Sequence, residues 1–293
     1  MYNYCDLSTA IPIKRERNNL QKRLLIILTS FVLLLSGVLL GISFVQEGDA
    51  GSYKNPDKSR LENIIAKGKI RVGTTGDYKP FTYWNPTTKQ YEGYDIDAAK
   101  QLAKDLGVKV EFVKTTWPTL MQDLQNNKFD ISMGGITRTL VREKTAHLSQ
   151  AYIQDGKSPL IRKEDKEKFK SLADIDKPNV KIGVNPGGTN EKFVRENIKN
   201  AQVILVQNNL EIPKMVAEGK VDVMITDSTE ARYYATQDER LSAILTENPF
   251  DLHEKGYLMP QGDLDFQNWI DLWMDEMKLQ GKFKELEKKW ISG

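Results

Sequence analysis

Apolar and polar positions alternate along the chain in a pattern that begins near residue 69. Short apolar runs there separate stretches with helical spacing, in the order KIRVGTT, DIDAAKQLAKDLG, VKVEFVKT, WPTLMQDLQNNK and FDISMGG. Strand-like runs that alternate with helical patterns are typical of β-α-β units, in which helices cover the faces of a largely parallel sheet. Residues 69–135 therefore predict one α/β unit.

The same alternation restarts at residue 180, as VKIGVNPG, TNEKFVRENIKN, AQVILVQ, NLEIPKMVAEGK and VDVMIT. A final amphipathic stretch over 265–290 follows, in which Trp269, Leu272, Trp273, Met277 and Phe283 have roughly helical spacing and are expected to be packing residues. Two α/β units joined by short segments predict an α/β fold of two lobes with a ligand cleft between them. Ligands in such folds bind beyond the carboxyl ends of strands, so the site is expected there.

The amino terminus differs from this pattern. Residues 24–45 form an uncharged run that, as a helix, is long enough to cross a bilayer core of ~30 Å. Polar residues with Gly and Pro but no apolar period follow, which predicts a linker. The expected organisation is a basic cytoplasmic region over 1–23, a membrane anchor or signal segment over 24–45, a linker over 46–60, a first lobe over 61–155 plus 251–293, and a second lobe over 156–250.

Charges around the apolar run predict its orientation. Basic residues precede it and acidic residues follow it, so the amino terminus is expected to stay in the cytoplasm and the lobes to be periplasmic or extracytoplasmic. A cleaved signal peptide usually has a shorter apolar stretch and a small-residue cleavage site. The length of 24–45 favours an uncleaved anchor in the cytoplasmic membrane, and cleavage stays open.

Composition excludes several classes of site. The residues before Leu24 have a net charge of +3 against +2 for the whole chain, so the remainder is near −1 and has no basic nucleic-acid footprint. The only cysteine, Cys5, precedes the apolar run, which excludes disulfides and cysteine metal sites from the lobes. His147 and His253 have no ligand-like neighbours in sequence, so neither a metal nor a cofactor is expected.

Five segments together resemble the amino-acid type of periplasmic solute-binding protein, whose fold is the two-lobed type II: RVGTTGDYKPF, YEGYDIDAAKQLAKDLG, FDISMGGITRTLVREKTAHLSQAY, KIGVNPGGTNEKF and GKVDVMITD. The resemblance covers residues 69–291. Within that family the chain is similar to the cyclohexadienyl dehydratases, through VGTTGDYKPF, WPTLMQD, DGKSP, VNPGGTNEKF, TDSTEAR and EKGYLMP. These are enzymes that convert prephenate or arogenate to phenylpyruvate or phenylalanine. The implied partner is therefore a small carboxylate substrate.

The resemblance implies a set of substrate-binding residues. Arg142, in GGITRTLVREK, matches the arginine that binds a ligand carboxylate, and a guanidinium is suited to this because its geometry is planar and bidentate. Gly135 and Thr137 match the groups that assist it. Without the motif, Arg142 would be interpreted as a solvated arginine on a helix. That interpretation is retained for Arg138 and Lys144.

Further matched positions extend this set. Tyr78 and Trp117 match the aromatic walls around the ligand, although a Trp before a Pro is more often a core residue. Asp227 matches a carboxylate that receives a ligand amine. Thr189 and Asn190 begin a helix whose free amides suit a second anionic group.

Several charged residues are left with open roles. Lys157 and Arg232 lie in matching segments and are possible partners of a second carboxylate. Asp95 and Asp97 are expected only to cap a helix.

Glu191 stands beside the glycine turn NPGG, in the first turn of a predicted helix. There the helix dipole stabilises an acidic residue by roughly 0.3–1 kcal/mol, which is a sufficient structural reason for a glutamate. The resemblance adds a catalytic one, because Glu191 matches the acid that dehydratases of this kind use. Loss of hydroxide and carboxylate makes the prephenate ring aromatic, so one general acid for the departing hydroxide is nearly the whole requirement.

Two other functions use the same fold. An extracytoplasmic solute-binding protein that delivers a polar amino acid to the permease of an ABC transporter would use Arg142 and Asp227, with Glu191 at the rim. A sensor input domain is disfavoured because no kinase or second membrane segment follows the lobes in this sequence.

Overall fold

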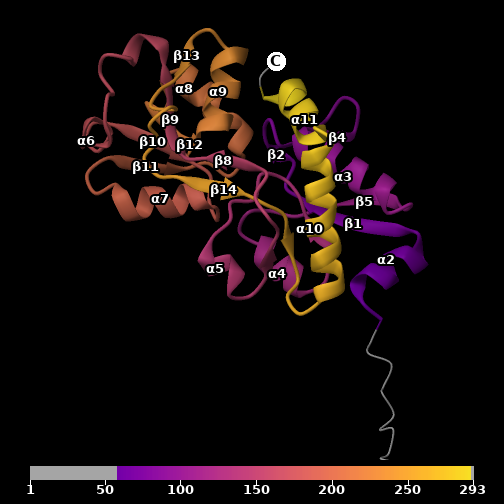
Figure 1. Ribbon diagram of the computed structural model, residues 1–293. Helices are drawn as coiled ribbons and strands as arrows, with labels where there is room; N and C mark the ends of the chain where they lie inside the picture. The colour runs from indigo at the N-terminus through magenta and orange to yellow at the C-terminus, as the bar shows by residue number, and fades with distance from the viewer. Residues whose placement is uncertain (1–57, 292–293) are drawn as a thin grey trace, which may run out of the picture. The chain divides into compact units, whose positions relative to one another are not determined.

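The computed structural model describes residues 58–291, which belong to one compact unit (Figure 1). The predicted cytoplasmic region, the membrane segment 24–45 and nearly all of the linker lie outside the described residues. Within 58–291, no helix is both long enough and apolar enough to span a membrane.

One five-stranded sheet forms the framework of the first lobe, with strand order β5-β1-β6-β15-β7. Its strands are β1 (Lys69–Thr74), β5 (Lys109–Lys114), β6 (Ile131–Ser132), β7 (His147–Leu148) and β15 (Leu258–Met259). Strand β1 pairs in parallel with β5 and β6, whereas β15 is antiparallel to β6 and β7. The helices of this lobe are α2 (Arg60–Lys67), α3 (Tyr94–Asp105), α4 (Leu120–Gln125), α5 (Leu140–Glu143), α10 (Leu264–Leu279) and α11 (Lys282–Trp290).

A second five-stranded sheet has the order β11-β10-β12-β9-β13. Its strands are β9 (Lys157–Arg162), β10 (Lys181–Val184), β11 (Gln202–Leu205), β12 (Val223–Asp227) and β13 (Leu241–Ala243). Strands β10, β11 and β12 are parallel, and β9 is antiparallel to β12 and β13. Its helical segments are η1 (Lys163–Asp165), α6 (Leu172–Ile175), α7 (Thr189–Asn197), η2 (Asn209–Glu211), α8 (Ile212–Ala217) and α9 (Ser228–Gln237).

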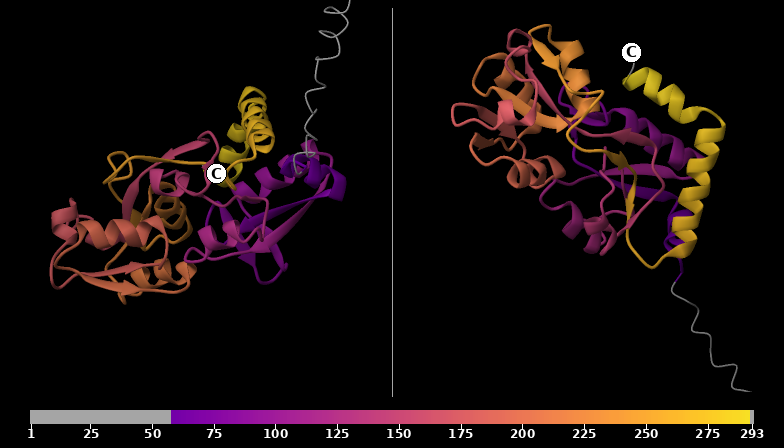
Figure 2. Two further views of the ribbon diagram at one scale, coloured as in Figure 1. Left: turned by 90° about the horizontal axis from the view of Figure 1, so that it is seen from below. Right: turned by 60° about the vertical axis from the view of Figure 1, so that its left-hand side comes forward.

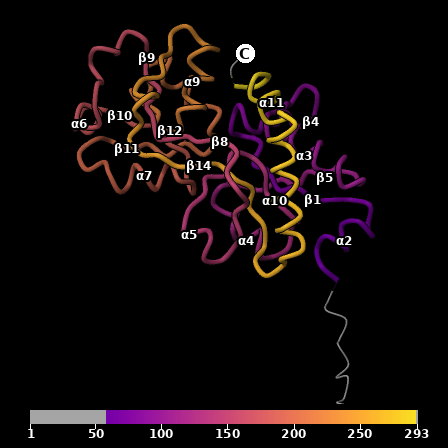
Figure 3. Tube along the Cα trace, in the orientation of Figure 1, coloured from indigo at the N-terminus to yellow at the C-terminus, as the bar shows by residue number. Residues whose placement is uncertain are grey.

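Two antiparallel strands, β8 (Ile153–Asp155) and β14 (His253–Lys255), connect the sheets (Figure 3). Each leads directly from one sheet to the other, since β9 follows β8 and β15 follows β14. A small three-stranded sheet of β2 (Asp77–Tyr78), β3 (Thr82–Asn85) and β4 (Gln90–Glu92) lies after β1. The lobe boundaries at 155/156 and 250/251 remain a prediction.

The carboxyl-terminal helices cover one side of the first lobe (Figure 2). Side chains at i, i+4, i+7 and i+11 of α10 are buried, as an amphipathic helix requires, and they are Phe266, Ile270, Trp273 and Met277. Leu272 was expected to pack with them but is 62% exposed, because it lies on the opposite face. The predicted helical stretch over 265–290 is two helices, since Gly281, at a φ of 70°, ends α10 and redirects the chain into α11.

Candidate functional site

A buried ionic cluster lies where the two sheets meet, centred on the carboxylate of Asp227 at the carboxyl end of β12. Lys157, directly opposite Asp227 in the β9–β12 register, places its Nζ 2.5 Å from Oδ1. Lys255, the last residue of β14, and the Tyr78 hydroxyl both donate to Oδ2. The ring of His253 adds Nε2 at 3.1 Å from Oδ1. Asp227 therefore has contacts from three different parts of the chain.

The ionisation of this cluster follows from its burial and its charges. Burial alone would raise the pKa of Asp227, but the positive charges of Lys157 and Lys255, with His253, outweigh it and hold that pKa well below its usual value. Burial acts to lower the pKa of His253, but hydrogen bonds to Asp227 and Asp251 raise it overall. Asp227 is therefore a carboxylate at neutral pH.

The first lobe contributes Gly135, Thr137 and Arg142 to the same region. Gly135 has a φ of 71°, and a Cβ there would lie 2.4 Å from the Tyr78 ring, so the tyrosine is positioned only because this residue is glycine. Arg142 Nη1 donates to the Thr137 carbonyl at 2.6 Å. Burial lowers the pKa of Arg142 to about 10, which leaves the guanidinium charged at neutral pH.

The expectation that Asp95 and Asp97 cap a helix is wrong, because the N-cap of α3 is Gly93 and no side chain caps it. Asp95 has a different role. Its side chain is fully buried and accepts hydrogen bonds from the Gly135 amide at 2.5 Å and the Tyr152 hydroxyl at 2.7 Å. It thereby fixes the loop that presents Gly135 and Thr137. Asp97 is a surface partner of Lys289 at 2.7 Å, so it also joins α3 to α11.

The second lobe contributes Thr189 and Asn190 from the start of α7. Lys157 Nζ donates to Thr189 Oγ1 at 3.0 Å and to Asn190 Oδ1 at 2.5 Å. Across the gap between the lobes, Thr189 Oγ1 lies 3.4 Å from Thr137 Oγ1. One small cavity is lined by residues of both lobes: Tyr78, Trp117, Gly135, Thr137, Asn185, Gly188, Thr189, Asn190 and Asp227. The structure thus brings together seven of the predicted site residues.

A larger cavity of about 710 Å³ adjoins this one, and both are lined by Trp117, Thr137, Gly188 and Thr189. Arg142, Lys157, His253 and Glu191 also line the larger cavity. Lys192, Arg195, Glu196 and Asp251 line it as well, and Arg142 and Lys157 are the most buried of its four cationic side chains.

Glu191 occupies the anion site that its own glycine turn creates. Its Oε2 accepts a hydrogen bond from the Gly187 amide at 2.6 Å, and its Oε1 pairs with Arg195 at 2.5 Å. The Gly187 hydrogen bond has the largest effect and lowers the pKa of Glu191; burial opposes it, and Arg195 lowers the pKa further, so that the net shift is downward. In the protein without substrate, Glu191 is therefore a carboxylate.

Arg232 lies apart from the cluster, on α9. Its guanidinium is half exposed and bonds to the Thr246 carbonyl at 2.9 Å and to Glu247 at 2.7 Å. Arg232 lines neither of the two adjoining cavities described above. Sequence reasoning instead missed Lys255 and His253, although EKGYLMP was among the matching segments. A lysine directly before an apolar run was the one available signal, and its partner Asp227 is 28 residues away.

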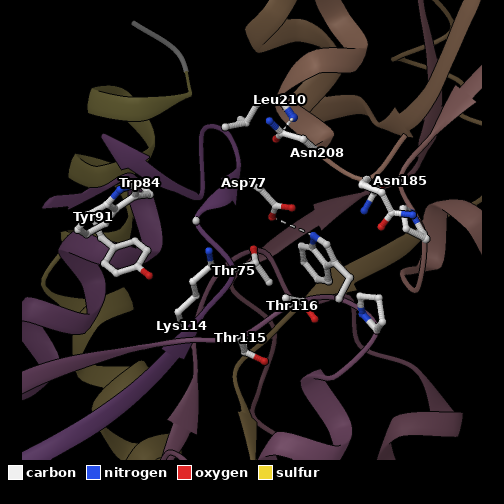
Figure 4. Close-up of a pocket in the computed structure, with 15 residues that line it drawn as sticks. Thr75, Asp77, Trp84, Tyr91, Lys114, Thr115, Thr116, Asn185, Asn208 and Leu210 are labelled. Carbon is white, nitrogen blue, oxygen red and sulfur yellow. Dashed lines mark hydrogen bonds between the residues drawn. The ribbon is translucent and has the colours of Figure 1, made fainter. Parts of the chain in front are cut away.

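A third cavity of about 730 Å³ is lined by Trp117 together with Thr75, Asp77 and Asn185 (Figure 4). Trp117 Nε1 donates to Asp77 Oδ1 at 3.0 Å, and Asn209 Nδ2 of the second lobe donates to the Asp77 carbonyl at 3.0 Å. Burial raises the pKa of Asp77, against its hydrogen bonds. Trp117, which was expected to form an aromatic wall, therefore lines all three cavities and is held by the Asp77 carboxylate.

The buried side chain of Glu230 is linked to the ionic cluster by hydrogen bonds. It accepts from the Thr226 hydroxyl and from Asn209 Nδ2, and Asn190 Nδ2 in turn donates to Thr226 Oγ1 at 3.2 Å. Burial raises the pKa of Glu230 well above its ordinary value. This chain of hydrogen bonds orients Asn190, whose Oδ1 accepts a hydrogen bond from Lys157 Nζ. Among residues 58–291, no group of three or more His, Cys, Asp or Glu side chains is placed to hold a metal ion.

Comparison with known proteins agrees with this architecture. Residues 70–293 match the bacterial extracellular solute-binding proteins, family 3. The chain is 41% identical to the cyclohexadienyl dehydratase of Pseudomonas aeruginosa over 242 residues, which cover 83% of this chain and 90% of the relative.

Two solved structures of ancestral proteins are also similar. One is an ancestral cyclohexadienyl dehydratase, 57% identical with a TM-score of 0.52, covering 80% of this chain and 98% of that one. The other is an ancestral amino-acid-binding protein described as a precursor of cyclohexadienyl dehydratase, 40% identical with a TM-score of 0.75, covering 80% and 100%. These neighbours confirm the predicted two-lobed type II α/β fold. The chain belongs to family 3 of the bacterial extracellular solute-binding proteins, in the branch that includes the cyclohexadienyl dehydratases.

Proposed function

We propose that this chain is a cyclohexadienyl dehydratase that converts prephenate, arogenate or both to phenylpyruvate or phenylalanine, with loss of water and CO2. The observation that carries this proposal is the convergence of Arg142, Lys157 and Glu191 on one cavity between the lobes. Two cations there suit a substrate with two carboxylates, and the carboxyl group suits a reaction that needs one proton donor. The 41% identity to a dehydratase supports the same function.

The reaction requires little from the protein. Protonated Glu191 donates its proton to the ring hydroxyl, the C–O bond breaks, and water departs. The C–C bond between the ring and its carboxylate breaks at the same time. CO2 leaves, and the electron pair of that bond stays in the ring and completes its aromatic system. Glu191 is left as a carboxylate and regains its proton from solvent. A positioned general acid of this kind contributes typically ~10²- to 10⁴-fold to a rate.

The other residues bind and orient the substrate. Arg142 binds the side-chain carboxylate, supported by Thr137 and Gly135, and Thr189 and Asn190 orient the anion on the second lobe. A lysine held close to the carboxylate that is lost would stabilise the ground state and oppose decarboxylation. Lys157 bonds to Asp227, Thr189 and Asn190, and these contacts restrain its ammonium group. Its positive charge therefore attracts the substrate from a fixed position.

Substrate binding must change the protonation of Glu191. In the protein alone its pKa is lowered, so the acid form is scarce at neutral pH. A dianionic substrate and closure of the lobes both favour the neutral carboxylic acid, because they add negative charge and remove water. We infer that the enzyme–substrate complex, and not the resting protein, creates the general acid.

Family membership assigns the chain to the outside of the cytoplasm and to binding of a small molecule. We further propose that residues 24–45 anchor it to the cytoplasmic membrane with the lobes outside. A permease partner belongs only to the alternative, in which the chain delivers a polar amino acid to an ABC transporter.

The test of the proposed function is turnover of prephenate by the purified protein, followed by the ultraviolet absorbance of phenylpyruvate. Catalytic turnover that scales with protein concentration is the expected result. The matched measurement is calorimetric titration with free polar amino acids. A folded protein that binds an amino acid tightly and leaves prephenate unchanged beyond its spontaneous rate would establish the transport alternative instead.

A further inference from the structure

We propose that the side-chain oxygen of Asn185 accepts a hydrogen bond from the ring hydroxyl of the substrate, and that the small cavity between the lobes holds this hydroxyl. The inference rests on the proposed function and adds a substrate-binding residue to the same site. Prephenate and arogenate both carry the hydroxyl on their ring, so the role of Asn185 is the same for either substrate.

The small cavity has the size of one hydroxyl group. Its volume is about 10 Å³, close to the smallest space that holds a water molecule. It adjoins the cavity of about 710 Å³, and both are lined by Trp117, Thr137, Gly188 and Thr189. A substrate whose ring and carboxylates occupy the larger cavity therefore has room in the smaller one for a single polar group.

Two lysines already donate to the other side-chain acceptors of the small cavity. Lys157 Nζ donates to the side-chain oxygens of three of them, Thr189, Asn190 and Asp227. Lys255 Nζ donates to Asp227 as well, and to the hydroxyl groups of Tyr78 and Thr137. Asn185 differs from these lining residues, because its Oδ1 accepts no hydrogen bond from residues 58–291. The cavity therefore offers its free side-chain acceptor to a ligand group that donates a hydrogen bond.

Asn185 is buried, so its free oxygen needs an explanation. The residue is only 4% exposed, and buried polar atoms of proteins nearly always have hydrogen-bond partners. Asn190, five residues later, has the ordinary arrangement. Its Oδ1 accepts from Lys157 Nζ, and its Nδ2 donates to Thr226 Oγ1 at 3.2 Å. A substrate hydroxyl that donates to Asn185 completes the hydrogen bonding of the cavity in the same way.

Asn185 and Glu191 lie on one short segment that joins β10 to α7. Asn185 directly follows β10 and lines the small cavity, whereas Glu191 lies in the first turn of α7 and lines the larger one. Gly188 and Thr189, between them, line both cavities. A hydroxyl at the junction of the cavities therefore lies at the segment that carries both side chains. Because its hydrogen is donated to Asn185, its oxygen lone pairs stay available for the proton of Glu191.

Asn185→Leu tests this role, because leucine is close to asparagine in shape and has no acceptor. The kcat/KM for prephenate is expected to fall at least about tenfold, the effect of one hydrogen bond lost from a buried site. Phenylpyruvate has no ring hydroxyl, so its dissociation constant, measured by calorimetric titration, should stay within about twofold of the wild-type value. Binding of phenylpyruvate also shows that the site of the variant is folded.

Two further variants complete the test. Asn185→Ala removes the acceptor without adding bulk, so it gives the same comparison if Asn185→Leu binds no phenylpyruvate. Gln207→Leu is the matched control, because Gln207 is an exposed amide that lines the third cavity and neither of the other two. This change should leave kcat/KM for prephenate within about twofold of the wild-type value.

Three results would count against the inference. Wild-type kcat/KM in the Asn185 variants would overturn it and leave the proposed function intact. An equal loss of prephenate kcat/KM and phenylpyruvate affinity in Asn185→Ala would also overturn it, since phenylpyruvate cannot make the hydroxyl contact. Absence of prephenate turnover by the wild-type protein would refute the proposed function, and this inference with it.

Discussion

Glu191→Gln is expected to lower kcat for prephenate roughly 10²- to 10⁴-fold, which is the usual contribution of a positioned general acid. Glutamine keeps the size of the side chain and can still accept the hydrogen bond from Gly187, but it cannot donate a proton to a leaving hydroxide. KM should change much less than kcat, because the interaction that is lost exists only in the transition state. Steady-state kinetics with phenylpyruvate detection measures both constants.

Glu196→Gln is the matched control for this variant. Glu196 lies on the same helix, pairs with Lys192 at 2.5 Å and lies at the wall of the same cavity. Its side chain is more than half exposed, so the change should leave kcat within a factor of about two, in line with the small effects of surface substitutions. A Glu191→Gln protein with wild-type kcat would exclude Glu191 as the acid.

Asp227→Asn is expected to destabilise the folded protein by about 3–5 kcal/mol, because it leaves two buried lysines without their counter-ion. For a domain of this size, the melting temperature should fall by roughly 6–20 °C. Equilibrium unfolding in urea measures the free energy, and the pH dependence adds a check. Since the pKa of Asp227 is depressed in the folded state, its contribution is present above the unfolded pKa of ~3.9 and is lost only as pH falls through the folded value.

Arg232→Gln provides the comparison, since it breaks a charge pair with Glu247 that is largely exposed. Exposed pairs contribute about 0–1 kcal/mol, so this variant should melt close to wild type. Asp227→Asn combined with Lys255→Met should recover part of the lost stability, because one of the uncompensated charges is also removed. Equal melting of the two single variants would show that the cluster is not the buried ionic network described above.

The alternation of strands and helices predicted the two lobes and the position of the site at the strand ends. It could not predict the ionic cluster, because that depends on strand directions the pattern does not encode. Lys157 faces Asp227 only because β9 runs antiparallel to β12, whereas the repeated pattern suggested a largely parallel sheet. Lys255 arrives from β14, a connecting strand too short to be recognised by periodicity.

The surroundings of single residues likewise depend on contacts that the sequence does not show. Arg232 shares a motif with Asp227, but five residues along a helix that begins at Ser228 direct it to Glu247 on the surface. Asp95 stands at a helix start, where a cap is the ordinary explanation, and only the fold brings the Gly135 amide to it. Glu191 was correctly expected at a helix start, but its pairing with Arg195 one turn later becomes visible only in the structure.

The measurement that tests the central claim most directly compares two pKa values of Glu191. One is obtained by NMR titration of its carboxyl carbon in the free protein, and the other from the pH at which kcat for prephenate falls as Glu191 loses its proton. We predict that the free value lies below the ordinary pKa of the side chain and that the value in the complex is at least about one unit higher, since kcat reports the enzyme–substrate complex. Equal values would contradict the claim that bound substrate creates the general acid.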